Sequence, residues 1–396
     1  MVRVFVEPTG RRIEPFGDPP GEALIHNRPL SAWQRDAFDA LGLEVVAEPP
    51  QGQPHLVIPD TLYTNASALK KFLDGAGGQN AVLVLKESLF GQYTSPIQPD
   101  LTHIDSGWRF EKVRFVGADP NAPVKEVVVD PEEKEVRIPT PAYYMGKDKL
   151  ELGLPKDPVM TIHHWVHVLW ANQIAWAVEA LAIPKWRWTA RVIWAAMRAM
   201  SLNKYRILNK LNRIGKNCDI HPTAVVEYSV LGDGVSVGPH SRVRFSVLGD
   251  KVSILGGSQA LFSVLGNNAI IGETSTLNFS VLYPEAVANQ AIMQLCVMGR
   301  RAVTTRGSLA IDLNFHQDIR VPLDGQFHNT GQRTLGSAYG HGVKVGSGVW
   351  MSSGRMLPND AFVIQNPDDI IRRMPKNLEY DGPLIVDTGA LVPWGK

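Results

Sequence analysis

Three histidines in the carboxyl-terminal half of the chain are of the type that serves as a general base. His316 and His328 lie in a stretch of varied polar side chains between residues 304 and 335, and His341 follows in a glycine-rich segment. A neutral imidazole can take a proton from a hydroxyl or an amine near pH 7. A polar stretch of this length with little apolar periodicity is typical of a functional loop or of a disordered one. The same histidines could instead brace the loop or contact another subunit, so both interpretations stay open.

Residues 1–159 alternate short apolar runs with segments of helical spacing. The strand-like and helix-like segments follow one another at 2–6, 31–41, 45–47, 56–58, 65–73 and 82–85. This alternation predicts an α/β domain with a mostly parallel sheet and helices packed on it. Ligands of such domains are expected in the loops at the carboxyl ends of the strands.

Residues 217–363 contain a phrase that recurs at a fixed step. Ser-Val-Leu begins at Ser229, Ser246, Ser263 and Ser280, which are evenly spaced along the chain. Inward-type apolar residues recur every five or six positions, whereas a helix needs three or four and a flat strand two. Stacked copies of one short three-sided coil fit this spacing. The stretch resembles a left-handed parallel β-helix of hexapeptide repeats, interrupted by a loop insertion at 304–335 and followed by a cap or tail at 364–396.

This resemblance implies one kind of chemistry. Many hexapeptide-repeat proteins are acyltransferases that use coenzyme A, and in them a histidine beside an excursion of the coil acts as the general base. The resemblance therefore implies a coenzyme A thioester as cofactor and a base chosen from His316, His328 and His341. Such rods commonly pack in threes, which implies a homotrimer. The repeat residues themselves argue only for a scaffold.

Four segments in the amino-terminal half of the chain resemble, in the same order, motifs of the sugar-phosphate nucleotidyltransferases. Residues 9–16 are similar to the GxGxRLxPL loop and residues 22–30 to PKALLPVxNRPL. Residues 59–62 are similar to the GDxL turn, and residues 164–173 to the PWDLLxANxxL helix. The segment at 1–159 is therefore interpreted as a degenerate nucleotidyltransferase-like α/β domain.

The second resemblance implies a different reaction and a different site. In that family a sugar phosphate attacks the α-phosphate of a nucleoside triphosphate, and the protein mainly positions and neutralises the phosphates. The implied set of phosphate- and substrate-binding residues is Gly10, Arg11, Arg12 and Asn27. Arg12 would contact the phosphates and Asp60 would hold Mg²⁺. Nucleotidyl transfer is the preferred interpretation of function, and coenzyme A-dependent acyl transfer is the alternative.

The chain departs from the nucleotidyltransferase motifs at two places. Glu7 and Pro8 precede Gly10 where small residues are wanted, and Glu22 matches the family's lysine. Reversing a unit charge about 4 Å from a phosphate oxygen costs roughly 4 kcal/mol at an effective dielectric constant of 20. These departures leave open a transferase of reduced or lost activity, and also a non-catalytic binding or assembly protein.

Residues 160–216 are predicted to form a tryptophan-rich, basic helical connector. Between 185 and 216 there are nine Lys and Arg and no acidic residue, and one helical face carries Trp186, Ala190, Ile193, Trp194, Met197 and Met200. That face could lie on an anionic membrane surface, but a hydrophobic joint between the two domains is the preferred interpretation. His163 and His167 have the spacing to share a metal, although packing in an aromatic cluster is favoured.

Composition limits the classes of function. The 396 residues include 40 Lys and Arg and 39 Asp and Glu, and this balance gives no electrostatic case for nucleic acid. Cys218 and Cys296 are the two cysteines, which suits a reducing compartment without disulfides. The amino terminus has no apolar stretch of signal-peptide length. We therefore expect a cytoplasmic protein, peripheral to a membrane if the connector binds lipid, that acts on small phosphorylated molecules.

Overall fold

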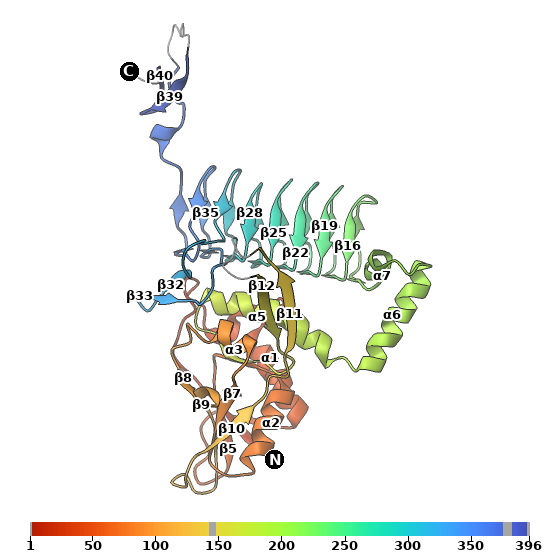
Figure 1. The fold of residues 1–396 in the computed structure, drawn as a ribbon, viewed down its shortest axis with the longest axis vertical. Coiled ribbons are helices and arrows are strands. Elements are labelled where there is room, and N and C mark those ends of the chain that lie inside the picture. Colours follow the sequence, from red (N-terminus) through yellow and green to blue (C-terminus); the bar gives the residue numbers. More distant parts are fainter. Residues whose placement is uncertain (1, 142–147, 375–381, 394–396) are drawn as a thin grey trace.

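The structure is a computed structural model that describes residues 2–141, 148–374 and 382–393. An α/β domain lies beside a rod of stacked strands, with a long helix between them (Figure 1). A helical arm projects at one end of the rod, and a small hairpin extends beyond the other end. The predicted fold class, an α/β domain followed by a helical connector and a left-handed parallel β-helix, is confirmed.

One mixed sheet forms the centre of the α/β domain. Its order is β10 (Lys125–Val129), β7 (Ala81–Lys86), β9 (Gly107–Val116), β5 (His55–Pro59), β1 (Arg3–Glu7) and β4 (Glu44–Val46). Only β9 runs opposite to the other described strands of this sheet, and β8 (Leu101–Ile104) pairs with its first residues. Helices α1 (Leu30–Leu41) and α2 (Ala66–Ala76) contribute their apolar faces to the same core. The chain reverses its direction of progress across the sheet at β1, because β4 and β5 flank β1 on opposite sides.

Smaller elements complete this domain. They are the 3-10 helix η1 (Pro20–Glu22), the pair β2 (Leu24–Ile25) and β3 (Arg28–Pro29), the pair β6 (Leu62–Thr64) and β13 (Val159–Thr161), helix α3 (Leu89–Thr94), and the pair β11 (Lys134–Pro139) and β12 (Lys149–Leu154).

The rod consists of three parallel sheets, one on each side of the coil. Within residues 213–363, all of which the structure describes, the first sheet has eight strands from β14 (Arg213–Ile214) to β37 (Met356–Leu357). The second also has eight, from β15 (Asp219–Ile220) to β38 (Phe362–Val363), and the third has seven, from β16 (Val225–Glu227) to β36 (Trp350–Met351). The coils send one side chain per sheet into the interior, mostly apolar, as the five- to six-residue spacing predicted; Thr304 is a polar exception. Leu248, Ile254 and Ala260 are one such set, and all three are buried.

The repeated serine holds the coils in register. The backbone N–H of Ser246 donates to the hydroxyl oxygen of Ser229 at 3.2 Å, and the same bond runs from Ser263 to Ser246 and from Ser280 to Ser263. All four serines are buried. A buried N–H without a partner costs about 1–3 kcal/mol. Each serine therefore satisfies a donor of the next coil.

Helix α5 (Trp165–Ala182) is the joint between the two domains. One apolar cluster contains the inward side of α5, the core of the α/β domain and outward residues of the first rod sheet, namely Val264, Val281 and Val297. Asn172 on this helix donates to the backbone oxygen of Leu24 at 2.8 Å and accepts from the His26 N–H at 2.8 Å. The helix is thus hydrogen-bonded to the α/β domain and shares an apolar core with the rod.

The prediction that residues 185–216 form a hydrophobic joint between the two domains is wrong for helix α6 (Lys185–Ala199). Ala195 is the buried residue of α6, whereas Trp186, Trp194 and Met197 are 72%, 56% and 63% exposed. Helices α6 and α7 (Lys204–Lys210) project from the end of the rod instead (Figure 1). The apolar spacing correctly indicated a helical face, but α5 already fills the space between the domains.

The rod is interrupted between β31 (Leu309–Ala310) and β34 (Ala338–Tyr339). The chain leaves the coil as an excursion, residues 311–337, that contains the hairpin β32 (Arg320–Leu323) and β33 (Gln326–Asn329). The excursion begins later than position 304, because β30 (Val303–Thr304) and β31 still pair within the rod. The serine series continues across the gap through sulfur: the Ser337 N–H lies 3.5 Å from Cys296 Sγ, and burial raises the pKa of that thiol to about 12.

Beyond residue 363 the chain leaves the rod. A 3-10 helix, η2 (Pro367–Asp369), precedes the hairpin β39 (Leu384–Asp387) and β40 (Ala390–Pro393), which stands away from the last coil (Figure 1).

The serine series gives a test of what holds the coils together. Ser263→Ala is expected to lower the free energy of unfolding by about 1–3 kcal/mol, because it leaves the buried Ser280 N–H without an acceptor. Ser263→Cys should cost less, since Cys296 fills the same place with sulfur. Urea unfolding of the two variants measures the difference. An alanine variant as stable as the wild type would show that the series contributes nothing.

Candidate functional site

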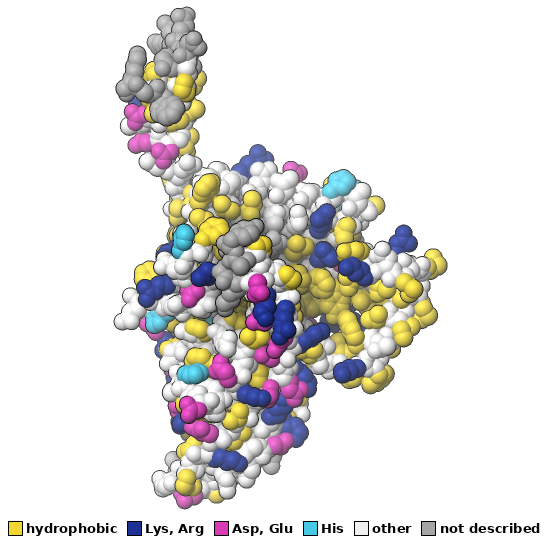
Figure 2. Space-filling model, in the orientation of Figure 1, with side chains coloured by type: hydrophobic (Ala, Val, Ile, Leu, Met, Phe, Trp, Pro, Cys, Tyr) yellow, Lys and Arg dark blue, Asp and Glu magenta, His cyan; other side chains and the backbone are white. Residues whose placement is uncertain are grey.

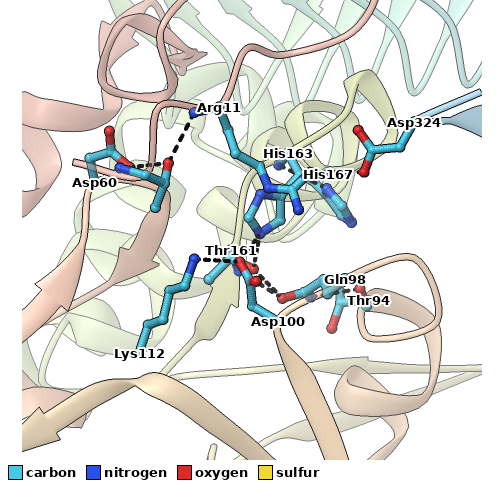
Figure 3. A network of polar contacts seen from close by, with 11 residues as sticks. Arg11, Asp60, Thr94, Gln98, Asp100, Lys112, Thr161, His163, His167 and Asp324 are labelled. Atoms are coloured by element: carbon cyan, nitrogen blue, oxygen red, sulfur yellow. Dashed lines mark hydrogen bonds and ion pairs between the residues drawn. The ribbon is translucent and has the colours of Figure 1, made fainter. Parts of the chain in front are cut away.

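A network of charged and polar side chains occupies the carboxyl ends of β1 and β5. This is the place where the strand order reverses, and ligands of open α/β sheets bind at such points. We call it the strand-end site and define it by Thr9, Arg11, Asp60, Asp100, Lys112, His163 and Asp324. Figure 3 shows Arg11 and Lys112 pointing toward the same space, with Asp100 between them and Asp324 facing Arg11 from the rod.

Asp60 shapes the loop that follows β1. Its Oδ1 accepts from the backbone N–H of Thr9 at 3.2 Å and from the Thr9 hydroxyl at 2.7 Å. The backbone N–H of Asp60 donates in turn to the carbonyl of Glu7 at 3.0 Å. The residue after Thr9, Gly10, has a φ of +68°, a conformation that costs glycine little. Asp60 therefore follows β5, and one of its oxygens anchors the loop after β1.

Arg11 reaches across to the rod. Its Nη1 lies 2.9 Å from Oδ2 of Asp324 at the tip of the β32–β33 hairpin. Asp324 and Gly325 both have positive φ, which is the geometry of a two-residue type I′ turn. The pair is only partly buried, with Asp324 59% exposed. Arg12 is exposed and lies 3.5 Å from the Gly17 carbonyl, so Arg11, and not Arg12, joins the strand-end site.

A chain of contacts runs from Lys112 into the interior. Lys112 Nζ is 3.4 Å from Asp100 Oδ2, and His163 Nε2 is 3.7 Å from the same oxygen. The Thr161 hydroxyl donates to Gln98 Oε1 at 2.7 Å, so it accepts from His163 Nε2–H at 2.8 Å. His163 is therefore the Nε2–H tautomer.

The three histidines at 163, 164 and 167 are buried and neutral. Burial lowers the pKa of His163 to about 4 and that of His164 to about 3. Burial, followed by the two neighbouring imidazoles, also lowers the pKa of His167 well below its ordinary value. The backbone N–H of His163 donates to His167 Nδ1 at 3.1 Å, and the rings of this pair meet edge to face. The two histidines whose spacing could have held a metal thus pack against each other, and one of the four ring nitrogens, His167 Nδ1, accepts a backbone hydrogen bond from within the pair.

The residues at Asp60 do not form a metal site by themselves. Among residues 2–141, 148–374 and 382–393, no group of three or more His, Cys, Asp or Glu side chains could hold a metal ion. Asp60 Oδ1 is already engaged by Thr9.

Asn27, a site residue implied by the nucleotidyltransferase resemblance, and Glu22, a departure from its motif, belong to other elements. Asn27 has a φ of +62° in the β2–β3 turn and donates to the Leu265 carbonyl of the rod at 2.8 Å. Glu22 belongs to η1. Glu7, the other departure from the motif, has its carboxylate 3.7 Å from Arg114.

His341 belongs to a second contact between rod and α/β domain. Its Nδ1 accepts from the Arg300 backbone N–H at 2.8 Å, so Nε2 carries the proton and lies 3.1 Å from Asp18 Oδ2. Burial alone would raise the pKa of Asp18, but His341 and Arg300 outweigh it and hold that pKa below its usual value. The ring also stacks on Phe16 at 5.2 Å. Both nitrogens are engaged, so this imidazole offers no lone pair for proton abstraction in this arrangement.

His316 and His328 lie on the excursion, apart from His341. His316 is exposed, and its backbone N–H donates to Asn314 Oδ1 at 3.1 Å. His328 is half-buried on β33, opposite Val321. Within the part of the chain that the structure describes, neither imidazole has a hydrogen-bond partner. The excursion also borders a groove of about 310 Å³ with α3 and β12, lined by Tyr93, Leu152, Asp318, Gln332 and Thr334 among others.

Four members of the strand-end site were missed by the sequence analysis: Asp100, Lys112, His163 as a polar partner, and Asp324. A signal existed for one of them. Asp324-Gly325 between two short strand-like runs is a strong hairpin signal, but nothing local to it shows that the tip meets Arg11, 313 residues earlier in the chain.

The buried histidines predict a loss of stability in mild acid. Unfolded imidazoles take up protons below pH 6.5, whereas His163 and His164 stay neutral in the folded chain until about pH 4 and 3. Stability is therefore complete above pH 6.5 and falls between pH 6.5 and 4, by about 2 kcal/mol per histidine at pH 5. Urea unfolding at pH 7 and 5 measures the slope.

Two variants assign that pH dependence to the buried histidines. His163→Gln should reduce the slope of the free energy of unfolding against pH. His103→Gln, a change at an exposed histidine, should leave this slope unchanged. Equal free energies of unfolding at pH 7 and 5 in the wild type would contradict the assignment.

The comparisons with known proteins give only structural likenesses. The chain matches no protein-family model, and no curated protein matches its sequence. It is similar to a Bacillus cereus structure described as an expected acetyltransferase, with 15% identity over 38% of this chain and 77% of that one and a TM-score of 0.17. Two Caulobacter crescentus structures in complex with coenzyme A and GDP-perosamine are also similar.

The first of these two is a variant of GDP-perosamine N-acetyltransferase, with 18% identity over 39% of this chain and 53% of that one and a TM-score of 0.14. The second is PerB, with 16% identity over 39% of this chain and 54% of that one and a TM-score of 0.14. This chain therefore spans about half the length of the two Caulobacter structures. Likenesses at these identities and TM-scores do not assign an activity to it.

Proposed function

We propose that the chain is a transferase whose strand-end site binds a phosphate-bearing substrate, a nucleotide or a sugar phosphate. The observation that carries the proposal is the Arg11–Asp324 pair at the carboxyl ends of β1 and β5. An arginine there faces the position where ligands of such sheets bind, and its guanidinium matches the geometry of a phosphate. In the structure the carboxylate of Asp324, on the hairpin of the excursion, forms an ion pair with that guanidinium.

Asp324 can give way to a stronger anion. A partly exposed ion pair is worth about 0–1 kcal/mol, and Asp324 stands on a two-residue turn with 59% of its side chain exposed. A phosphate brings more negative charge and more acceptor oxygens than one carboxylate. Binding would therefore exchange Asp324 for the phosphate on Arg11 and release the hairpin tip.

The other members of the site have supporting roles in this proposal. Lys112 adds a second cation pointing toward the same space, and charge neutralisation is the main contribution of proteins to phosphoryl and nucleotidyl transfer (Figure 3). Asp60 fixes the loop through Thr9, which positions Arg11. Neutral His163 lies 3.7 Å from Asp100 and adds no positive charge of its own to the site.

Opposite effects at the two ends of the ion pair test the proposal. Arg11→Gln should weaken phosphate-ligand binding about tenfold to a hundredfold, the worth of a charged hydrogen bond. Asp324→Asn should tighten it up to about fivefold, because the competing carboxylate is removed. Titration calorimetry and thermal shift with UTP, ATP, glucose 1-phosphate and pyrophosphate, with and without Mg²⁺, measure the affinities. Pyrophosphate release from UTP plus glucose 1-phosphate tests turnover.

Arg12→Gln is the matched control, since this arginine is exposed next to Arg11 and outside the network. Its affinities should equal those of the wild type. Failure of all four ligands to bind, or a loss confined to Arg12→Gln, would overturn the proposal.

Coenzyme A-dependent acyl transfer from the rod is the second candidate. The observation in its favour is that His316 and His328 have imidazoles without hydrogen-bond partners among the described residues, which leaves a ring nitrogen of each open to take a proton. Acetyl-coenzyme A hydrolysis or transfer that falls in His316→Gln or His328→Gln, with Arg11→Gln unaffected, would favour this candidate over the first.

A further inference from the structure

Helices α6 and α7 form an arm, residues 185–210, that displays large apolar side chains to solvent. Met200 and Leu202 are 91% and 92% exposed. Trp186, Trp194 and Met197 on the same arm are exposed as well. Figure 2 shows hydrophobic side chains over the projecting arm, with Lys and Arg beside them. Monomeric soluble proteins rarely leave so many large apolar groups together on one face.

The other face of the arm is attached to the first coil. The Trp188 ring meets Tyr228 edge to face at 5.7 Å, and the Tyr228 N–H donates to the Leu208 carbonyl at 3.1 Å. Ala195 is buried. The apolar groups named above are therefore held outward, and the arm does not need to unfold to present them.

Charge on the arm has one sign. Residues 185–210 carry seven Lys and Arg and no Asp or Glu. Some of these cations lie over the exposed aromatic rings: the Arg198 guanidinium is 4.5 Å from the Trp194 ring centre, and Lys204 Nζ is 5.0 Å from that of Tyr205. Apolar groups among cations and aromatic rings are the composition of helices that lie in the interface of an anionic membrane.

The arm is too short to cross a bilayer. No single helix among the described residues has the length and apolar character of a membrane span; α5 and α6 would pass only as a pair bent by 96°. The inward side of α5 belongs to the core between the domains. At about 1.5 Å per residue, α6 covers roughly 22 Å, less than the ~30 Å of a hydrocarbon core.

We propose that the arm docks the protein on an anionic lipid surface, with Trp186, Trp194, Met197, Met200 and Leu202 in the interface and the cations at the headgroups. A second copy of the chain fits the arm less well. A symmetric dimer places the same patch on both sides of the contact, so it would bring two sets of cations together without one acidic side chain from residues 185–216 to offset them.

Vesicle flotation with the purified full chain tests the proposal. The protein should float with vesicles that mix dioleoylphosphatidylcholine and dioleoylphosphatidylglycerol at a seven-to-three molar ratio, and stay below with pure phosphatidylcholine. Raising the salt to about 1 M should release it, because the screening length falls to about 3 Å. Arg187→Gln/Arg198→Gln should lower the partition coefficient about tenfold to thirtyfold, since each basic residue near such a surface contributes roughly fivefold. Trp194→Ser/Met197→Ser should also lower it.

Matched controls carry the same changes on the rod. Arg242→Gln/Lys344→Gln alters net charge equally, and Trp350→Ser removes a 68% exposed tryptophan; both should float like the wild type. Wild-type protein that stays below with anionic vesicles, or floats equally with both lipids, would overturn the proposal. So would a molar mass by light scattering that drops in the arm variants without any vesicle binding, because the face would then be a contact between copies.

Discussion

A single apolar core spans the α/β domain, α5 and one outer face of the rod, and the position of everything else depends on it. Apolar packing has no direction of its own, so polar contacts at its edges must set the orientation. Asn27 on the Leu265 carbonyl and Asn359 on the Phe16 carbonyl do this at two separate places. The Asp18–His341 contact adds a third. With the two bodies held in this way, the hairpin of the excursion meets the carboxyl ends of β1 and β5, and the strand-end site is completed by residues of both bodies.

The coils of the rod stack regularly because the same ring contacts and serine hydrogen bonds repeat from one coil to the next. Phe245, Phe262 and Phe279 stack at 4.8 Å with nearly parallel rings, although each has a positive φ that a phenylalanine rarely adopts. The regular stack and the buried serines beside it compensate for this strain. The long excursion can leave such a rod because the pairing of β29 (Val297–Met298) with β34 resumes directly beneath it. The varied polar side chains of the rod therefore gather where the repeat is absent.

Local spacing in the sequence predicted the repetitive part of the fold and the first half of the α/β domain. The even spacing of the Ser-Val-Leu phrase predicted the rod, and the alternation of segments over 1–85 predicted β1, β4, β5, β7, α1 and α2, whereas α3 and the strands from β8 to β13 were not predicted. The prediction failed for α6, because an apolar helical face looks the same whether a neighbour covers it or solvent does. It could not find Lys112, Asp100 or Asp324 as partners, since their meeting depends on how two bodies pack. Arg11 and Arg12 are adjacent in sequence, and only the backbone direction after Gly10 decides which one turns inward.

The contact between Asp18 and His341 joins residues 323 positions apart. A ribosome adding about 5–20 residues per second needs roughly 15–65 s to travel that distance. In the later part of this interval the α/β domain and α5, which end at Ala182, have been made, while the coils that will cover the apolar side of α5 are still being made. The nascent chain therefore carries an uncovered hydrophobic helix for much of its synthesis, which makes it a client for chaperones that bind such surfaces.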